Sequence, residues 1–473
     1  MIYKIYGPPG TGKTYTLIEK AKEYLDLGTP PHKIGYFAFT RKAAKEALSR
    51  MPLEPKKLVY FQTLHSFAYH QLSLNDTDIM QPYHYEDLGK QLNIKVKYHD
   101  KYNDEEIHYL TCDNEYFQLI GRAINRDITI REEFDRGEHD KKNVKWSILK
   151  HIDANFKEYK TANKLNDFND IIKRIIEKDK LPQFEVVFID EAQDLSPLQW
   201  KLYDKLKEYT NDIYLAGDDD QAIFGWAGAD VDRFITEPAE ETVLEQSQRI
   251  ARQIQEESIK PIENIRGLRK QKEYLPKDEE GHVSYISNFG QVDLSKGKWL
   301  ILARTSSKLI ELMKELKKEN YYFQSNKGRS YNRKIYKAAI NYTLFCKGEE
   351  IAEKYLKDIH EFTENKIDKS KPWYEAFTNA NQKEINYIRI LLEKGEDLDS
   401  DARIWFSTIH TIKGGESDNV ILSLHQGSKV QKSIKRSIEK SDEENRVWYV
   451  AITRAKYNLY KLKTKDKRKE YII

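Results

Sequence analysis

The sequence has 473 residues, of which 39% are hydrophobic and 33% charged, and its formal net charge is +3. This length allows two or more domains with buried cores, and the nearly balanced charge means that any surface for polyanions is local. No stretch has the roughly 18 consecutive apolar residues of a membrane span, and the first residues do not resemble a signal peptide. The two cysteines, Cys112 and Cys346, predict neither a disulfide framework nor a zinc site, which favours a reducing, cytoplasmic setting.

The first predicted element is a strand at residues 2–6, which leads into the glycine-rich sequence GPPGTGKT at residues 7–14. Apolar residues at helical spacing follow, so the run has the strand–loop–helix context of a phosphate-binding loop. Glycines let backbone N–H groups approach phosphate oxygens, and the start of the helix favours negative charge. We expect Lys13 to reach the β- and γ-phosphates and the Thr14 hydroxyl to bind Mg²⁺. The candidate phosphate-binding residues are Gly10, Thr11, Gly12, Lys13 and Thr14. A structural glycine turn is the alternative.

Two adjacent carboxylates, Asp190 and Glu191, directly follow an apolar, strand-like run at residues 186–189. A buried strand does not favour carboxylates at its end unless a cation meets them. In P-loop enzymes that transfer phosphoryl groups, one carboxylate holds Mg²⁺ and another acts on the attacking water. We therefore expect Asp190 to bind Mg²⁺ together with Thr14, and Glu191 to orient and deprotonate water. A surface turn after a strand is the alternative interpretation.

Apolar, β-branched and aromatic runs alternate with helical patterns along most of the chain, which is typical of parallel sheets flanked by helices. The strand-like runs form two sets, so we expect an α/β fold with two such sheets. The first set lies at residues 2–6, 33–39, 58–63, 185–190, 212–217 and 242–246. The second set lies at residues 282–286, 298–305, 321–325, 404–410, 419–425 and 458–464.

Segments along nearly the whole chain resemble, in the expected order, the motifs of superfamily 1 DNA helicases of the UvrD/Rep type. Any one of these short segments is weakly specific, but their combination in sequence order is highly specific. The run IDEAQDLSPLQ resembles motif II of this family. The other matching segments are residues 37–51 (motif Ia), 62–69 (Ib), 165–172 (before motif II), 215–230 (III), 244–250 (IV), 301–312, 407–422 (V) and 443–456 (VI).

The resemblance implies a motor that uses ATP and Mg²⁺ and binds single-stranded DNA. It places Arg249 and Arg454, two cations whose forked donors suit phosphate oxygens, at the γ-phosphate from a second domain. Gln221 matches the residue that links the γ-phosphate to the DNA-contacting loop, and Glu416 matches a motif V residue near the nucleotide. The candidate DNA-contacting residues on these motifs are Phe39, Thr40, Thr63, His65, Phe224, Trp226, Thr408 and His410. Ordinary core packing is the alternative for the aromatic residues, above all for Phe39.

The sequence departs from the family pattern around the nucleotide base. Tyr15 and Gln248 stand where the family often has arginine and tyrosine, and no glutamine-bearing segment precedes the phosphate loop in this sequence. These sites lie around the base, with Tyr15 as a candidate contact, so nucleotide preference is left open. In motif III, Ala227 replaces an arginine common in the family, which predicts one weaker DNA contact.

The resemblance also predicts the domain organisation. Two RecA-like domains are expected, domain 1A at residues 1–70 and 162–247, and domain 2A at residues 248–345 and 401–473. A helical 1B insertion is expected at residues 71–161. Residues 346–400 leave room only for a much reduced 2B insertion.

Three functional hypotheses follow. The first is an ATP-dependent helicase and translocase moving 3′→5′ on single-stranded DNA and acting at single-strand/duplex junctions in replication, repair or recombination. The second is a translocase that displaces proteins from DNA with little unwinding, because the 2B region is small. The third is a P-loop ATPase switch without nucleic-acid activity. The family further implies replication or repair partners, no membrane association, and a monomer or weak oligomer.

Overall fold

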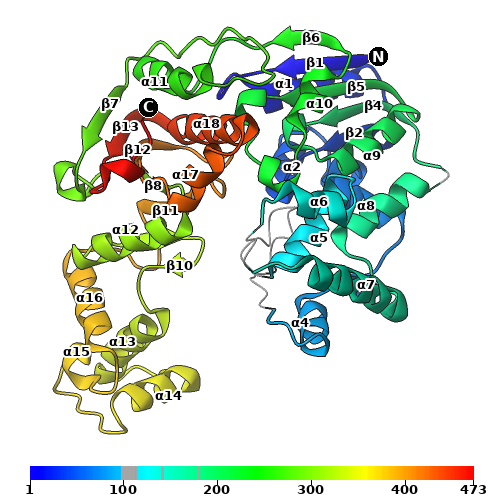
Figure 1. The fold of residues 1–473 in the computed structure, drawn as a ribbon. Helices are drawn as coiled ribbons and strands as arrows, with labels where there is room; N and C mark the ends of the chain where they lie inside the picture. Colours follow the sequence, from blue (N-terminus) through cyan, green and yellow to red (C-terminus); the bar gives the residue numbers. More distant parts are fainter. Residues whose placement is uncertain (97–111, 113, 140–142, 179, 473) are drawn as a thin grey trace. The chain divides into compact units, whose positions relative to one another are not determined.

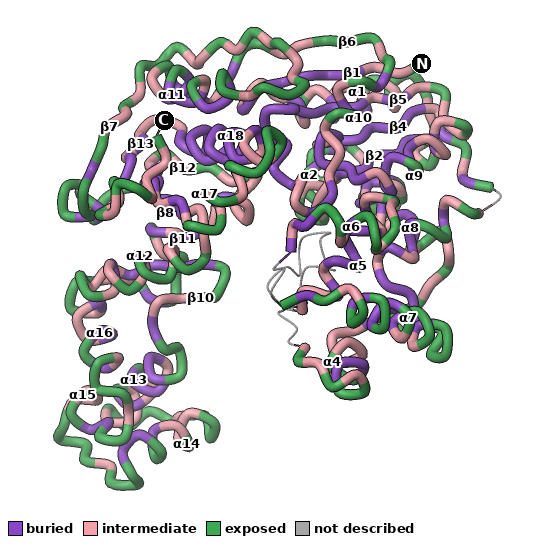
Figure 2. The backbone as a smooth tube through the Cα atoms, in the orientation of Figure 1, coloured by how far each residue is buried: buried purple, intermediate pink, exposed green. Residues whose placement is uncertain are grey.

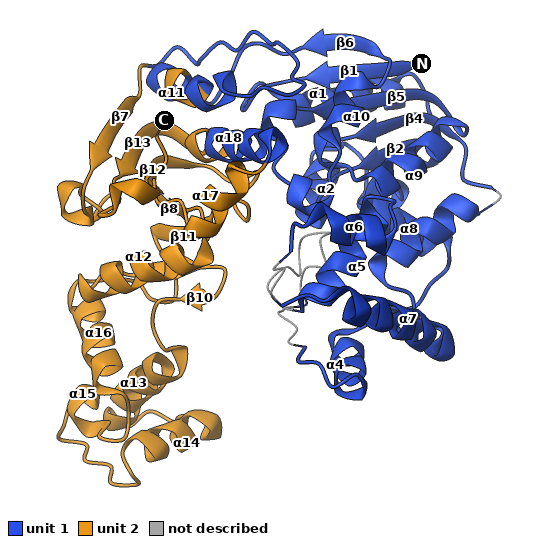
Figure 3. Cartoon of the chain, in the orientation of Figure 1, with its two compact units in different colours: residues 1–255, 259–279, 437–449 blue, residues 256–258, 280–436, 450–473 orange. Residues whose placement is uncertain are grey.

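The computed structural model describes residues 1–96, 112, 114–139, 143–178 and 180–472. The chain packs as two units (Figure 3). Unit 1 comprises residues 1–255, 259–279 and 437–449, and unit 2 comprises residues 256–258, 280–436 and 450–473. Among the described residues, no helix combines the length and apolar character needed to cross a membrane.

Unit 1 contains a six-stranded sheet in the order β3-β2-β4-β5-β1-β6, in which every neighbouring pair is parallel (Figure 1). Its strands are β1 (Ile2–Tyr6), β2 (Ile34–Phe37), β3 (Phe61–Gln62), β4 (Phe184–Ile189), β5 (Thr210–Gly217) and β6 (Glu240–Val243). Burial of β4 on both faces explains its nearly continuous apolar sequence (Figure 2). Because all the strands are parallel, the segments that follow β1, β4 and β5 emerge at the same edge of the sheet.

Helices cover both faces of this sheet. Ile5, Val186 and Phe188 point to one face, where they pack against α1 (Lys13–Asp26) and α2 (Arg41–Ser49). The alternate residues of the same strands point to the opposite face. That face packs against α3 (Leu64–Gln71), α8 (Phe168–Glu177), α9 (Pro197–Lys207) and α10 (Val231–Thr236).

A second, helical core within unit 1 lies in the region expected to be the 1B insertion. Buried residues of α4 (Pro82–Gln91), α5 (Glu115–Asn125) and α7 (Trp146–Asn163) form it, and α6 (Ile130–Arg136) packs at its edge. Parts of the expected 71–161 insertion, residues 97–111, 113 and 140–142, lie outside the described residues.

Unit 2 contains a seven-stranded sheet in the order β10-β9-β11-β8-β12-β13-β7, parallel except for the β9–β10 pair. Its strands are β7 (His282–Ile286), β8 (Trp299–Ala303), β9 (Phe323–Ser325), β10 (Gly328–Arg329), β11 (Ile404–Thr408), β12 (Ser417–Ser423) and β13 (Ala455–Leu462). Buried residues of α12 (Ser306–Lys318) cover one face. The prediction of two mainly parallel α/β sheets is therefore confirmed.

A small helical body with its own core extends unit 2. It consists of α13 (Arg333–Cys346), α14 (Glu353–Phe362), α15 (Trp373–Ala376) and α16 (Gln382–Glu393), whose buried side chains pack together. It begins at Arg333, within the segment expected for domain 2A, and extends through most of residues 346–400, where the sequence leaves room for a reduced insertion. Helix α17 (Ser428–Ile434) also belongs to unit 2.

The boundaries of the packing units differ from the expected domain boundaries. The sequence places the start of the second domain at residue 248, but residues 248–255 and 259–279 pack with unit 1. Two helices also have residues in both units, namely α11 (Arg252–Glu263) and α18 (Ile438–Ile452). The limits of the 1A, 1B, 2A and 2B segments remain predictions.

Candidate functional site

The glycine-rich loop joins the end of β1 to the first turn of α1 in unit 1. Gly10 and Gly12 have φ angles of 79° and 92°, a left-handed conformation that glycine adopts without steric cost. Lys13, the first residue of α1, contacts the start of the loop, because its ammonium donates a hydrogen bond of 2.6 Å to the Gly7 carbonyl. A cation held at the N-terminal end of a helix, inside a glycine loop, is the arrangement that binds phosphate.

Asp190 lies at the end of β4, against the first turn of α1. Its carboxylate accepts hydrogen bonds from the Thr14 hydroxyl at 2.7 Å and from the Tyr36 hydroxyl at 3.1 Å. Burial, together with the neighbouring Glu191 carboxylate, raises the pKa of Asp190 to about 6. A hydroxyl and a buried carboxylate are oxygen ligands of the kind that Mg²⁺ prefers, so this pair fits the cation expected from the sequence.

Glu191 has a φ of 57°, a conformation that is uncommon for a non-glycine residue. Gln193 holds this region together in two ways, because its amide nitrogen donates to the Glu191 carboxylate and its amide oxygen accepts the Asp218 N–H at 3.1 Å. Gln193 therefore joins the segments that follow β4 and β5. Asp218 in turn accepts a hydrogen bond of 2.7 Å from the Gln221 side chain. Glu191 and Gln221, two candidates from the sequence, are thus connected through Gln193 and Asp218.

The motif IV segment lies against the glycine-rich loop within unit 1. The Ser247 hydroxyl donates to the Pro9 carbonyl at 2.9 Å, and the Gln248 N–H donates to the Gly10 carbonyl at 2.9 Å. A β-carbon added to Gly10 would lie 2.6 Å from the Arg249 β-carbon, so this close approach requires glycine. The β-carbon of Arg249 therefore lies beside the phosphate loop, and both belong to unit 1. From the sequence, Arg249 is expected in the second RecA-like domain.

Arg454, Glu416, Thr408 and His410 belong to unit 2. The Arg454 side chain is 1% exposed and donates to the carbonyls of Val450 and Gly415, at 2.9 and 3.1 Å. Arg454 thus lies next to the residue that precedes Glu416, whose carboxylate pairs with Lys456 at 2.9 Å. The structure brings these motif V and motif VI candidates together.

The DNA-contact candidates differ in exposure. Phe39 and Trp226 are partly exposed, and the Phe39 ring stacks on the buried Phe224 ring with centroids 5.2 Å apart. Thr40 and the buried Thr63 accept backbone N–H groups as the caps of α2 and α3. The ring of the remaining unit 1 candidate, His65, contacts Phe168 edge-on at 6.0 Å.

Two candidates of unit 2 lie at the end of β11. The Thr408 hydroxyl is 2.8 Å from the Thr411 hydroxyl. Burial, with Arg304 and Lys413 nearby, holds the pKa of His410 well below its usual range. Two cations, Arg304 and Lys413, therefore disfavour the charged form of His410.

A buried ion cluster stabilises motif III. Its two cations, Lys272 and Arg269, are not predicted from the sequence. The carboxylates of Asp218, Asp219 and Asp220 all contact the Lys272 ammonium, whose side chain is 1% exposed. Arg269 binds Asp220 with two hydrogen bonds of 2.6 and 3.0 Å. Three adjacent buried carboxylates were a signal that cations must lie nearby.

Comparison with known proteins agrees with this geometry. Residues 2–242 match the UvrD/REP helicase N-terminal domain, and residues 329–466 match the UvrD-like helicase C-terminal domain. The chain belongs to the UvrD/REP helicase family. The resemblance inferred from the motifs is therefore confirmed.

Individual helicases of this family are similar to the chain at low identity. The ATP-dependent DNA helicase PcrA of Bacillus subtilis is 25% identical over 376 residues, which cover 74% of this chain and 49% of PcrA. A probable DNA helicase of Mycoplasma pneumoniae is 28% identical over 253 residues, 49% of this chain and 46% of the relative. PcrA of Staphylococcus epidermidis is 26% identical over 243 residues, 48% of this chain and 32% of the relative. The chain thus spans about half of these helicases or less.

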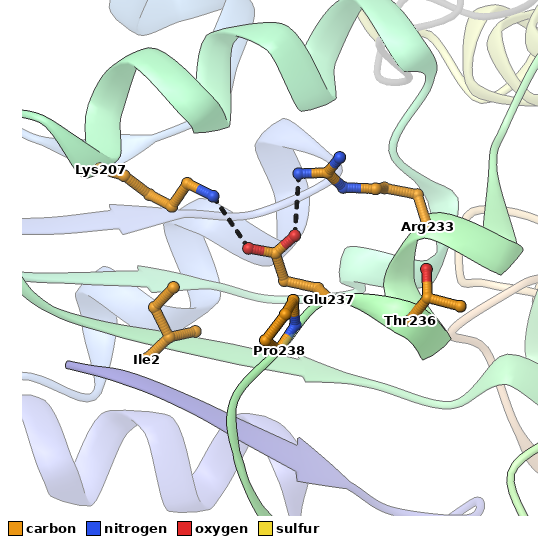
Figure 4. A pocket seen from close by; sticks show the side chains of 6 residues that line it. All are labelled: Ile2, Lys207, Arg233, Thr236, Glu237 and Pro238. Atoms are coloured by element: carbon orange, nitrogen blue, oxygen red, sulfur yellow. Dashed lines mark hydrogen bonds and ion pairs between the residues drawn. The ribbon is translucent and has the colours of Figure 1, made fainter.

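This UvrD/REP family member has a surface pocket beside the start of β1 (Figure 4). It is lined by Ile2, Lys207, Arg233, Thr236, Glu237 and Pro238. The buried Glu237 carboxylate pairs with Lys207 at 3.0 Å and with Arg233 at 2.8 Å. The two cations of the pocket therefore both pair with Glu237, and none of the described residues that line it is a candidate from the motifs.

Proposed function

We propose that this chain is an ATP-dependent DNA helicase and translocase that moves 3′→5′ on single-stranded DNA and unwinds duplex at junctions. Membership of the UvrD/REP helicase family supports a DNA motor. The observation that carries the proposal is the hydrogen bond from Thr14 to Asp190, because it joins the phosphate loop to the carboxylate that follows β4. The RecA-like domains of the motor are domain 1A (residues 1–70 and 162–247) and domain 2A (residues 248–345 and 401–473).

The triphosphate of ATP is the proposed ligand of the glycine loop. Lys13 pairs with the β- and γ-phosphates, and backbone N–H groups from Gly10 to Thr14 bind the phosphate oxygens. Thr14 and Asp190 would hold Mg²⁺, which would neutralise phosphate charge there. Glu191 orients the attacking water and takes its proton, and the Gln193 side chain limits the positions that the Glu191 carboxylate adopts.

Two arginines are proposed to stabilise the charge that develops on the γ-phosphate. Arg249 is supported by its close packing against Gly10. Arg454, from the end of motif VI, is proposed to reach the same phosphate during the cycle, with Glu416 beside the nucleotide. Gln221 contacts the γ-phosphate, and its position changes the conformation of the motif III loop when the γ-phosphate is bound or released. Tyr15, which is 59% exposed, is the proposed contact for the base.

The proposed DNA track uses rings and small polar groups. Stacking on aromatic rings contributes ~1–3 kcal/mol per base and tolerates any sequence, as a translocating protein requires. Partial exposure of Trp226 and Phe39 supports their stacking on bases. The remaining proposed contacts are Thr40, Thr63, His65, Phe224, Thr408 and His410.

The small helical body of α13–α16 favours a second candidate, a translocase that displaces proteins from DNA with little unwinding. Hydrolysis of ATP with and without single-stranded DNA is the first test, because a P-loop switch without nucleic-acid activity would show no stimulation. Duplexes with a 3′ tail or a 5′ tail are then compared. Unwinding of the 3′-tailed duplex alone supports the helicase. Stimulated hydrolysis with no unwinding of either duplex supports the second candidate, and preference for the 5′ tail contradicts the proposed direction.

A further inference from the structure

One peptide group of the motif III loop is bound at both of its ends by charged side chains of unit 1. This group joins Gly225 to Trp226 in a short 3₁₀ turn at Gly225–Ala227. Its carbonyl oxygen, on Gly225, accepts a hydrogen bond of 3.2 Å from the Arg126 guanidinium. Its N–H, on Trp226, donates a hydrogen bond of 2.8 Å to the Glu443 carboxylate. The two side chains come from segments far apart in the sequence, one at the end of α5 and one in α18.

The same two side chains are joined to each other through a line of ion pairs. Glu443 pairs with Lys440 at 3.0 Å, and Lys440 pairs with Glu138 at 3.6 Å. Glu138 pairs with Arg126 at 3.0 Å. The contacts therefore form a closed ring that starts at the Gly225 carbonyl and returns to the Trp226 N–H. We call these four side chains, Arg126, Glu138, Lys440 and Glu443, the peptide clamp.

The clamp is shielded from water, which strengthens its interactions. The side chains of Arg126, Glu138, Lys440 and Glu443 are only 9%, 20%, 16% and 15% exposed. Although burial opposes ionisation, Lys440 and Arg126 hold the pKa of Glu138 below its usual range. Hydrogen bonds between a charged group and a peptide are also stronger than those between neutral groups. The clamp therefore restricts rotation of the Gly225–Trp226 peptide plane.

Rotation of this plane would redirect the Trp226 side chain, because the peptide plane sets the backbone direction at the Trp226 α-carbon. Neighbouring contacts limit the loop further, since the Asn125 side chain donates to the Ala227 carbonyl at 3.4 Å. A β-carbon added to Gly225 would lie 3.2 Å from the Glu443 carboxylate, so the peptide approaches Glu443 closely. Helix α18, which carries Glu443, continues to Ile452, two residues before Arg454.

We infer that Arg126 and Glu443 are positioning residues, which hold the Gly225–Trp226 peptide so that DNA on Trp226 is coupled to ATP hydrolysis. This inference rests on the proposed function. Neither residue touches ATP or DNA in this role, and both act through the motif III loop. Loss of the clamp leaves the phosphate loop intact but lets the Trp226 side chain adopt several orientations. DNA binding at Trp226 then no longer stabilises the loop conformation that speeds ATP hydrolysis.

The test compares ATP hydrolysis without DNA and with saturating single-stranded DNA. In Glu443→Ala and Arg126→Met, we expect the stimulation by DNA to fall roughly tenfold, as the loss of a charge-assisted hydrogen bond predicts. Hydrolysis without DNA should stay close to that of the parent, because the two side chains bind the motif III loop and not the phosphate loop. Glu443→Gln keeps an oxygen that accepts the Trp226 N–H, so it restores most of the stimulation. Glu439→Ala is the matched control, because Glu439 lies on the same helix with a side chain 70% exposed.

Each result has one meaning. If DNA stimulates hydrolysis in the parent and equally in Glu443→Ala and Arg126→Met, the positioning role is wrong and the proposed function stands. An equal loss of basal and stimulated hydrolysis with a lower melting temperature shows a merely structural role and also overturns it. If Glu443→Gln is as defective as Glu443→Ala, the peptide contact is not what matters and the inference fails. A parent without any stimulation by DNA contradicts the proposed function, and the clamp inference falls with it.

Discussion

The Thr14 hydroxyl donates a hydrogen bond of 2.7 Å to the Asp190 carboxylate, although 176 positions separate the two residues in the sequence. Thr14 is fixed by the first turn of α1, and Asp190 by the end of β4. Because β1 and β4 are parallel strands of one sheet, their carboxyl ends lie at the same edge. The contact explains why an apolar strand ends in two carboxylates, since they face the loop that is proposed to bind phosphate and Mg²⁺.

Substitution at the phosphate loop separates nucleotide binding from chemistry. Lys13→Ala should lose ATP affinity, because it removes the ammonium held inside the loop. Glu191→Gln should bind ATP but hydrolyse it ~10²–10⁴-fold more slowly, the usual cost of losing a positioned base. Equilibrium binding of a fluorescent ATP analogue and steady-state hydrolysis measure the two effects. Near-parental turnover by Glu191→Gln would reject its role as the base.

Removal of the Asp190 charge tests the metal site. Asp190→Asn retains an oxygen that accepts the Thr14 hydroxyl but loses the charge that attracts Mg²⁺, so hydrolysis should need far more Mg²⁺ and remain slow. Tyr36→Phe is the control, because it removes one hydrogen bond of 3.1 Å from the same carboxylate and leaves its charge. Titration of Mg²⁺ against hydrolysis rate checks both variants, and chelation with EDTA should stop the parent. An unchanged Mg²⁺ requirement in Asp190→Asn contradicts the assignment.

The two arginines are expected to act on hydrolysis rather than on DNA affinity. Arg249→Ala keeps the β-carbon that packs on Gly10 and removes only the guanidinium, and Arg454→Ala removes the other proposed cation. Both should depress DNA-stimulated hydrolysis far more than DNA binding measured without nucleotide. Arg468→Ala serves as the control, because the Arg468 side chain is 90% exposed. Normal turnover with lost DNA binding would instead assign these arginines to the DNA track.

Truncation of Trp226 distinguishes a stacking ring from a core residue. Trp226→Ala should weaken single-strand binding by ~1–3 kcal/mol at any sequence, while salt dependence barely changes because the ring carries no charge. Trp226→Phe keeps an aromatic face and should retain most of the affinity. Fluorescence anisotropy with labelled oligonucleotides measures both variants. A truncated core tryptophan would cost ~3–5 kcal/mol of stability, so a sharply lower melting temperature with normal DNA binding rejects stacking.

The buried cluster around Lys272 should matter for stability. Lys272→Met leaves Asp218, Asp219 and Asp220 without the ammonium that contacts all three, and loss of one partner of a buried ion pair costs about 3–5 kcal/mol. Thermal melting should show a marked fall for Lys272→Met. Lys270→Met is the control, because the Lys270 side chain is 32% exposed and its ammonium pairs with Glu241. Equal melting temperatures for the two variants would contradict this prediction.

The sequence by itself determined the elements and the chemistry that depends on neighbouring residues. The phosphate loop, the carboxylates after β4 and all the sheet strands except the two-residue β10 were predictable, because glycine placement, apolar runs and turn residues act over a few positions. The order of the motif segments along the chain was also visible in the sequence, and it predicted the family. These features are local, so they do not require knowledge of which distant segments pack together.

Only the tertiary structure decided which distant residues support those motifs. Arg249 packs on Gly10 within unit 1, although its position in the sequence suggested a second domain. Lys272 reaches motif III from a segment whose sequence shows only ordinary surface-like charge. Glu443 reaches it from the start of motif VI, where the sequence assigned this residue no role. Such contacts depend on how helices and loops return to the sheet, and charge alone does not specify a partner. Burial then selects the pairs, because a buried carboxylate or peptide group is stable only when another group meets it.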